Sequence, residues 1–202
     1  MSLVVSFGDN LVAKGWPAMP VVISMLRGVN VGGHNLIKMD ALRALCESLG
    51  LQDPQTYVQS GNVIFRTKER DLSRLARRIE NEIERRFSFR PGVIVRTSSD
   101  LRDVIDRNPF AARRDLDPSK LLVTLLATDP GPDAREALLR IKPDAEELWI
   151  AGRELYIYFP TGIGRSKLPP LLDRTLKNSS TARNWNTVTR LLAMAEKLEA
   201  SR

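Results

Sequence analysis

The chain has 202 residues, of which 43% are hydrophobic and 27% are charged, a composition typical of a soluble globular protein. Its formal net charge of +7 favours acidic partners such as phosphates or nucleic acid. One cysteine and one histidine exclude a disulfide within the chain and an ordinary zinc site, and no apolar run approaches the ~20 residues of a membrane span. We therefore expect a cytoplasmic protein that has no membrane segment, metal or cofactor.

The first eighteen residues fit the rest of the sequence poorly. They have no lysine- or arginine-rich start and no cleavage signature, so they do not resemble a signal peptide. Met19 and Pro20 stand directly before the first convincing strand. We interpret residues 1–18 as an extension, either disordered or added by cloning or an early start codon. The alternative is an extra strand through Leu3, Val4 and Val5.

The first half of the chain contains six predicted elements. A β-branched run predicts a buried strand, and two longer segments have apolar residues at spacings of three and four, which predicts helices. Two further strands flank a tight turn at Ser60 and Gly61. In chain order the elements are a strand at 21–26, a helix at 38–49, strands at 56–59 and 62–66, a helix at 71–87 and a strand at 92–97. This β-α-β-β-α-β order is typical of ferredoxin-like plaits.

The second half repeats the same order. A helix capped by Ser98 or Ser99 ends near Arg107, and a charged connector leads to a second set of strands and helices. Asn186 is expected to cap a final helix that runs to Leu198. The predicted strands are 121–126, 147–150, 154–159 and 180–182, and the predicted helices are 132–141 and 168–176.

We therefore predict an α+β fold, a tandem pair of ferredoxin-like plaits with an extra C-terminal helix. Residues 19–97 would form the first plait, and residues 98–119 a linker that contains a helix. Residues 120–202 would form the second plait together with the C-terminal helix.

A glycine-rich polar loop follows the first predicted strand. Glycines allow close backbone approach, so the backbone amides of this loop, together with the start of the next helix, can form an anion nest. The alternative is a crossover loop whose asparagines bond to its own backbone. The polar residues and glycines concerned are Arg27, Asn30, Gly32, Gly33 and Asn35.

A second polar cluster lies near the C-terminus. Arg165, Ser166 and Lys167 follow two glycines and precede a helix, so cations, a hydroxyl and a helix N-terminus come together as they do in phosphate cradles. Arg183, Asn184 and Asn186 stand at the start of the final helix. The alternative is a solvated basic face, which is what most charge runs form.

The remaining polar residues give weaker signals. Gln59 and Asn62 flank the hairpin turn, where turn chemistry alone accounts for Asn62. His34 has no carboxylate or serine partner in its motif, which makes it a poor general base. Cys46 falls on an apolar helix stripe and is expected to be a buried, inert thiol.

Four motifs, in order, resemble a known family. They are MLRGVNVGGHNLIKMDALRALCESLG, TYVQSGNVIF, GIGRSKLP and TARNWNTVTRLLAMA, and together they span about Pro20 to Leu198. The chain is similar here to the family catalogued as domain of unknown function 1697. The resemblance implies a pair of ferredoxin-like plaits and supplies no activity, cofactor or catalytic residue.

These observations leave three hypotheses open, all for a protein that we expect to be a monomer. The first is a binding module for a phosphate-bearing small molecule, such as a nucleotide, or for nucleic acid, in a basic cleft between the plaits. The second is an enzyme that acts on an anionic small molecule, and the third is a purely structural polar seam between the plaits. The candidate ligand-binding residues are Arg27, Asn30, Gly32, Gly33, Asn35, Gln59, Asn62, Arg165, Ser166, Lys167, Arg183, Asn184 and Asn186.

Overall fold

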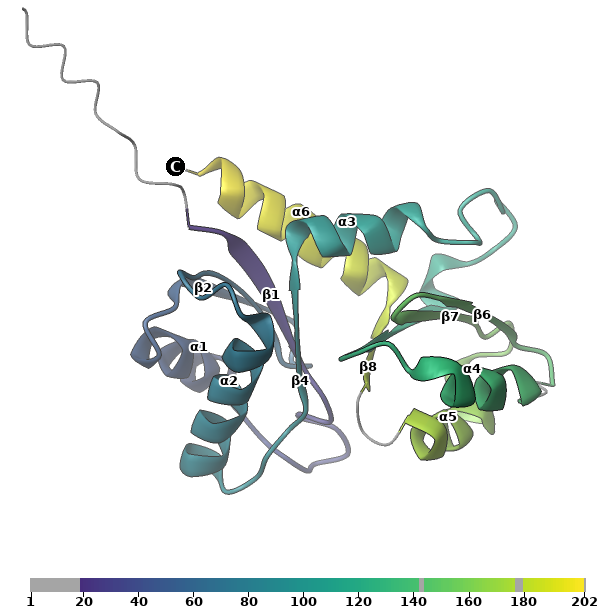
Figure 1. Cartoon of the computed structure of the whole chain (residues 1–202), viewed down its shortest axis with the longest axis horizontal. Coiled ribbons are helices and arrows are strands. Elements are labelled where there is room, and N and C mark those ends of the chain that lie inside the picture. Colours follow the sequence, from purple (N-terminus) through teal and green to yellow (C-terminus); the bar gives the residue numbers. More distant parts are fainter. Residues whose placement is uncertain (1–18, 142–143, 177–179, 202) are drawn as a thin grey trace, which may run out of the picture.

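The structure is a computed structural model that describes residues 19–141, 144–176 and 180–201 (Figure 1). The predictions for residues 1–18, including a strand at Leu3 to Val5, lie outside the described residues.

The first half is a four-stranded antiparallel sheet with two helices on one face. The strand order is β2-β3-β1-β4, so β1, the most apolar strand, is central and all six of its residues are buried. Two clusters of core residues lie on opposite faces of this sheet, and the cluster under the helices includes Val22, Leu45 and Ile79. The elements are β1 (Val21–Leu26), α1 (Met39–Ser48), β2 (Gln52–Tyr57), β3 (Asn62–Arg66), α2 (Leu72–Phe87) and β4 (Val93–Thr97).

The second half repeats this arrangement with the strand order β6-β7-β5-β8. Its two helices pack over Leu126, Leu155 and Ile157, and this cluster is smaller than its counterpart in the first half. Two short 3-10 helices, η1 (Pro118–Lys120) and η2 (Ile163–Arg165), lie in its connections. The main elements are β5 (Leu121–Leu126), α4 (Gly131–Arg140), β6 (Glu147–Ala151), β7 (Glu154–Tyr158), α5 (Leu168–Leu176) and β8 (Ser180–Asn184).

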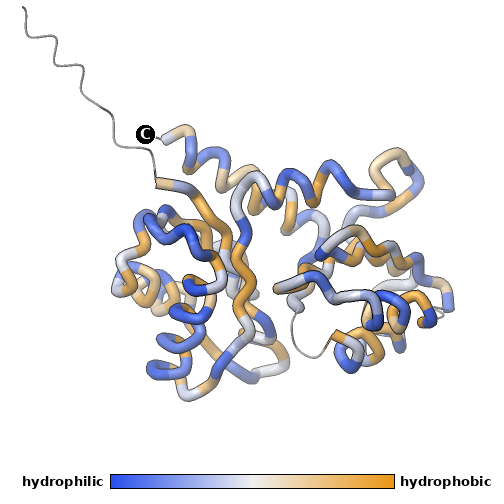
Figure 2. The backbone as a smooth tube through the Cα atoms, viewed as in Figure 1, coloured by the Kyte–Doolittle hydropathy of each residue, from blue (hydrophilic) through white to orange (hydrophobic). Residues whose placement is uncertain are grey.

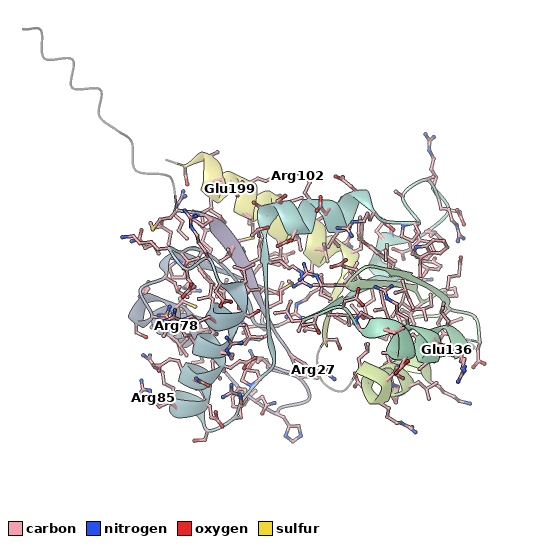
Figure 3. All side chains as sticks on the ribbon, viewed as in Figure 1. Arg27, Arg78, Arg85, Arg102, Glu136 and Glu199 are labelled. Atoms are coloured by element: carbon pink, nitrogen blue, oxygen red, sulfur yellow. The ribbon has the colours of Figure 1, made fainter. Side chains whose placement is uncertain are left out.

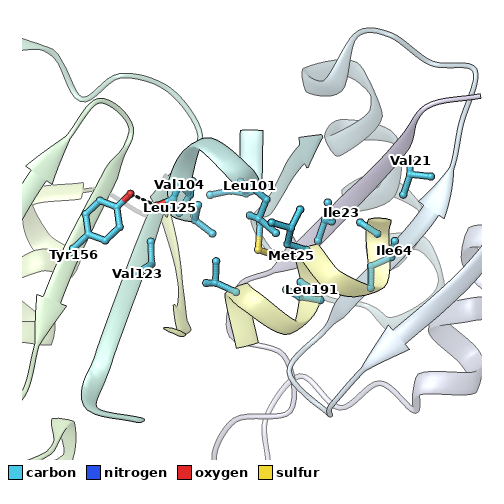
Figure 4. Close-up of a cluster of buried hydrophobic side chains, with 14 of the residues drawn as sticks. Val21, Ile23, Met25, Ile64, Leu101, Val104, Val123, Leu125, Tyr156 and Leu191 are labelled. Carbon is cyan, nitrogen blue, oxygen red and sulfur yellow. Dashed lines mark hydrogen bonds between the residues drawn. The ribbon is translucent and has the colours of Figure 1, made fainter. Parts of the chain in front are cut away.

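Two further helices, α3 (Ser98–Asp106) and α6 (Trp185–Ala200), join the halves. They pack against each other, and α6 also contacts β1 and β3 of the first sheet and β5 and β8 of the second (Figure 1). One core cluster therefore contains Met25, Val123 and Leu191 together (Figure 4). In the same cluster the hydroxyl of Tyr156 donates a 2.7 Å hydrogen bond to the carbonyl of Val104. The two sheets thus share one hydrophobic core.

The α+β prediction is confirmed by the two antiparallel sheets and the six α-helices of the described residues. Two predicted helix caps are wrong by a few residues. Thr97 caps α3 in place of Ser98 or Ser99, because its hydroxyl accepts from the Asp100 amide while the Asp100 carboxylate accepts from the Thr97 amide. Asn184 caps α6 in place of Asn186, whose backbone amide donates to the Asn184 side chain at 2.9 Å.

One strand is longer than the sequence indicates. β2 begins at Gln52 because its ladder with β3 continues past an irregularity between Gln52 and Gln55. Asp53, in this irregular stretch, has a φ of 53°, a backbone conformation that strand propensity does not anticipate.

Hydropathy follows this architecture: apolar residues concentrate along the strands, and α2 presents mostly polar residues (Figure 2). Among the described residues, none of the helices has the length and apolar character needed to cross a membrane.

Candidate functional site

A cavity of about 350 Å³ lies between the two halves. Its floor belongs to the second half and is apolar, with Leu122 and Ile157 from the sheet, Phe159 directly after β7 and Leu172 from α5. Its opposite wall is the loop that follows β1, together with the β2–β3 turn. We call this cavity the Arg27 cleft, after the cation in its wall. The topology thus brings the first polar loop and the Ser180–Arg183 segment together at this cavity.

Arg27 reaches from the first half to the second, at the opening between them (Figure 3). Its Nη1 donates to the carbonyl and the hydroxyl of Ser180, at 2.9 and 3.1 Å. Its Nη2 donates to Asp173 Oδ1 at 2.8 Å, where Asp173 is 62% exposed and the Arg27 side chain 23% exposed. Two of the five guanidinium hydrogens, one on Nε and one on Nη2, have no acceptor in the described part of the chain. Arg27 therefore retains capacity to bind an anion.

Arg183 is the second arginine of the cleft and is only 7% exposed. Its Nε donates to Asn62 Oδ1 at 2.5 Å, and Nη2 donates to the carbonyls of Leu26 and Ser60 at 2.7 and 3.0 Å. Nη1 donates to the Thr181 hydroxyl and the Ala182 carbonyl, both at 2.8 Å. All five N–H groups are thus used by protein acceptors.

Burial lowers the pKa of Arg183 to about 10, which still leaves the guanidinium charged at neutral pH. Within 19–141, 144–176 and 180–201 no carboxylate pairs with this cation. Carbonyl and amide dipoles therefore compensate its charge, and they come mostly from the first half. This is the geometry expected of a polar seam between the halves.

The asparagines of the first loop bond to neighbouring backbone. The Asn30 amide donates to the carbonyls of Ile37 and Gln59, at 3.0 and 2.7 Å, and its carbonyl oxygen accepts from the Ile37 amide. The Asn35 amide donates to the Gly28 carbonyl at 3.1 Å. Asn30 and Asn35 have φ values of 57° and 53°, a conformation that asparagine tolerates better than most residues. These two amides shape the loop and tie it to the β2–β3 turn.

The β2–β3 turn packs closely under the first strand. A Cβ atom at Gly61 would lie 2.9 Å from the Cβ of Leu26, so only glycine fits there without a shift of the backbone. The Asn62 amide donates within the turn to Tyr57 and Ser60, while its oxygen accepts from Arg183. Val58 has a φ of 50°, an outlier for a β-branched residue.

The other predicted residues lie around the cleft rather than in its wall. Arg165 and Lys167 are exposed, and neither makes a hydrogen bond or ion pair within the described ranges. They lie in the chain between Ile163 and Pro169, which line the cavity. The Ser166 hydroxyl accepts from the Leu168 amide at the start of α5. Gly32, Gly33, Gln59 and Asn186 are exposed, and the Asn184 amide donates to the Ser119 carbonyl.

Three polar residues of the cleft were missed by the sequence analysis as site residues. Asp173 occupies an ordinary helix position, and Ser180 is the first residue of β8, so neither carries a local signal. Thr181 was inside a recognised motif, yet only the fold places its hydroxyl beside Arg183. The apolar floor was read as strand and helix core.

Residues with catalytic chemistry do not gather here. His34 is exposed and is absent from the cavity wall. Cys46 is a buried residue of α1, and desolvation raises the pKa of its thiol to about 12, so it is an inert thiol at neutral pH. In the part of the chain that the structure describes, no group of three or more His, Cys, Asp or Glu side chains is arranged to hold a metal ion.

The chain belongs to a family described as "Protein of unknown function (DUF1697)", whose family model matches residues 19–156. A solved structure of a conserved bacterial protein from Streptococcus pneumoniae is similar, with a TM-score of 0.71 at 20% sequence identity. That similarity covers 89% of this chain and 99% of the other, and at this identity it supports the fold alone. The search of curated proteins found no match to the sequence.

The residues matched by the family model include the loop and hairpin motifs of the first half. It ends before Arg165, so the resemblance of the GIGRSKLP and TARNWNTVTRLLAMA motifs stays a prediction.

Proposed function

We propose that this protein binds a small phosphate-bearing molecule, such as a nucleotide, in the Arg27 cleft. The observation that carries the proposal is the contrast between the two arginines of the cleft. The protein uses every donor of Arg183, whereas Arg27 is partly exposed and has two donors free of described acceptors. A guanidinium that a scaffold holds in place with spare donors is well suited to bind an oxyanion.

The shape of the cleft suggests what else the ligand carries. A cavity of about 350 Å³ is in the size range of small-molecule sites, and its apolar floor at Leu122, Ile157 and Phe159 suits a flat apolar group. The exposed cations Arg165 and Lys167 flank the residues of one wall and add positive potential. We therefore favour a nucleotide or a similar organic phosphate over nucleic acid, which is too large for this cavity.

The structural alternative has its own support at Arg183. Its bonds to Leu26, Ser60 and Asn62 join β8 to the first half, as a polar seam requires. We propose a division of roles in which Arg183 holds the halves in register and Arg27 contacts the ligand. The enzyme alternative has no comparable observation in its favour.

Binding of a nucleoside monophosphate tests the proposal. In isothermal titration calorimetry with AMP, GMP, CMP and UMP, we expect at least one to bind. Arg27→Gln should weaken that binding about 10-fold or more, because a charged hydrogen bond contributes about 1.5–3 kcal/mol. Arg174→Gln is the matched control: Arg174 is exposed on α5, next to Asp173, and lies outside the cavity wall.

Two results would contradict the proposal. One is equal affinity of the wild type and Arg27→Gln for the bound nucleotide. The other is no binding of any of the four nucleotides or of inorganic phosphate. The nucleic-acid version is tested separately, since its affinity for oligonucleotides should fall steeply with salt.

We also infer that each half is a ferredoxin-like plait, because both have the β-α-β-β-α-β order with the strand order 2-3-1-4 within the unit. Residues 19–97 and 120–202 would then be two structural repeats, and residues 98–119 the linker that supplies α3. The single buried cysteine fits a monomeric protein of the reducing cytoplasm.

A further inference from the structure

A second cavity, of about 400 Å³, lies where α2 and β4 meet the second half. It shares no lining residue with the Arg27 cleft. Its lining includes Arg77 on α2, Arg96 on β4 and Arg153 in the β6–β7 turn, together with the acids Glu80 and Asp100. We call it the Arg96 cavity. Its function is independent of the function proposed for the Arg27 cleft.

Arg96 is a buried cation whose hydrogen bonds are incomplete. It is 3% exposed, and its Nε is buried and has no acceptor among the described residues. Its other nitrogens donate to the carbonyls of Val95 and Leu126. Glu154 Oε1 forms a buried ion pair with Arg96 Nη2 at 3.7 Å, a separation beyond hydrogen-bond distance. A buried charged donor without an acceptor is costly, and because Arg96 also lines the cavity, an acceptor bound there would relieve that cost.

The two other arginines of the cavity are also weakly paired. The closest approach of Arg153 to a carboxylate is 3.7 Å, to Asp100. Arg77 is exposed and has no hydrogen bond or ion pair within the described segments. Of the three arginines, Arg96 and Arg153 thus have only long ion pairs, to Glu154 and Asp100.

The acids of the cavity, by contrast, are already engaged. Glu80 accepts from Arg90 at 3.0 Å and from the Val93 amide at 3.1 Å. Asp100 accepts from the amide and hydroxyl of Thr97 in the capping box of α3. With the Glu80–Arg90 pair set apart, three arginines face two carboxylates, Asp100 in the lining and Glu154 beside Arg96.

The charges around Arg96 favour an added anion. Desolvation and the nearby Arg153 lower the pKa of Arg96, while desolvation raises the pKa of Glu154 against the opposite effect of Arg96, Arg107 and Arg153. A bound phosphate would offset the positive charge that the two carboxylates leave. The planar guanidinium groups of Arg96 and Arg153 match the geometry of a phosphate.

We propose that the Arg96 cavity is a second binding site, for a small organic phosphate whose phosphate group is held by Arg96 and Arg153. Leu72 and Ala76 of α2 line the same cavity and accommodate the apolar part of the ligand. Because α2, β4 and the β6–β7 turn all contribute to the lining, a bound ligand bridges the two halves.

Inorganic phosphate is the probe, and the side-chain Nε–Hε resonances of the ¹⁵N-labelled full chain are the readout. With ionic strength held constant by chloride, the Arg96 and Arg153 resonances should shift and saturate together. The titration of the Arg96 resonance gives the phosphate concentration at which half of the sites are filled. Arg153→Gln should raise this concentration about 10-fold or more, because it removes charged hydrogen bonds to the phosphate. Arg153 is a safer site for substitution than the buried Arg96, which the fold requires.

Two control variants locate the signal. Arg114→Gln removes an exposed arginine of the connector and should leave the Arg96 titration unchanged. Arg27→Gln removes the cation of the first cleft and should also leave the Arg96 titration unchanged. A failure of this proposal can therefore be told apart from a failure of the function proposed for the Arg27 cleft. The proposal is overturned if phosphate does not move the Arg96 resonance, or if Arg153→Gln titrates like the wild type.

Discussion

Arg27 and Arg183 are both cations of one cleft, yet they have different surroundings. Arg27 lies in a loop and keeps donors available, while Arg183 lies on β8 with its charge surrounded by carbonyl and amide oxygens. A buried guanidinium costs free energy unless its donors are satisfied, so the loop carbonyls around Arg183 fix its position. At the residue scale, the number of donors in use distinguishes Arg183, which joins the halves, from Arg27, for which we propose a binding role.

Arg183→Gln should destabilise the protein by about 2 kcal/mol or more. The substitution removes the guanidinium bonds to the Ser60 carbonyl and to Asn62 Oδ1, and leaves the Leu26 carbonyl with only the 3.4 Å bond from the Thr181 hydroxyl. Each acceptor that loses its partner costs about 1–3 kcal/mol. Part of this cost is offset because a cation no longer has to be desolvated. Urea unfolding followed by circular dichroism measures the change, and the exposed Arg165→Gln should change the unfolding free energy by under about 0.5 kcal/mol. Equal effects of the two substitutions would contradict the structural role.

Side chains at the edge and at the end of β4 set the limits of this strand. Helix α3 follows β4 without a loop. Side chains satisfy two backbone groups of β4: Glu80 accepts from the Val93 amide, and Arg96 donates to the Val95 carbonyl. A free edge is a site for unwanted pairing, and polar side chains of this kind block it. The strand then passes into α3 at Thr97, where the capping box stops the strand and starts the helix.

Thr97→Ala should lower the free energy of unfolding by about 1 kcal/mol, because the Asp100 amide loses its acceptor. Ser99→Ala is the matched control, since Ser99 is exposed, lies in the first turn of α3 and makes no cap. Urea unfolding should show a reduced midpoint for Thr97→Ala and little change for Ser99→Ala. The reverse order of effects would place the cap at Ser99.

At the scale of the molecule, α3 and α6 form a layer that both sheets use. The shared cluster takes Met25 from the first sheet and Val123 from the second, with Leu191 of α6 fully buried. Each sheet has one face covered by its own two helices, and neither half can bury the other face without α3 and α6. The two repeats are therefore expected to unfold together.

Leu191→Ala should lower the melting temperature of a single calorimetric transition. Removing this side chain costs about 2–5 kcal/mol, as for other large-to-small changes in cores. The exposed Leu139→Ala in α4 is the control and should leave the transition near its wild-type temperature. Two separate transitions, with only one moved by Leu191→Ala, would show that the halves fold independently.

The sequence determined the elements and their order because these depend on local patterns. The alternation of β-branched runs, amphipathic stripes and glycine turns placed β1, α2 and β5 within a residue or two of their observed bounds. It also singled out the loop at Arg27 and the segment at Arg183 as polar clusters. Cap identity at Thr97 was less predictable, because several adjacent residues can serve as caps.

Only the tertiary structure decided what each polar residue does. Arg27 keeps spare donors, and Arg183 has all of its donors bonded, because of acceptors that lie more than a hundred residues away in the chain. The unpaired Nε of Arg96 likewise depends on which other elements pack around it. Asp173 and Arg153 carry no local signal, since their roles arise from the contact between the halves. A sequence pattern encodes which residues a helix or strand buries, whereas the pairing of charges depends on distances that only the folded chain sets.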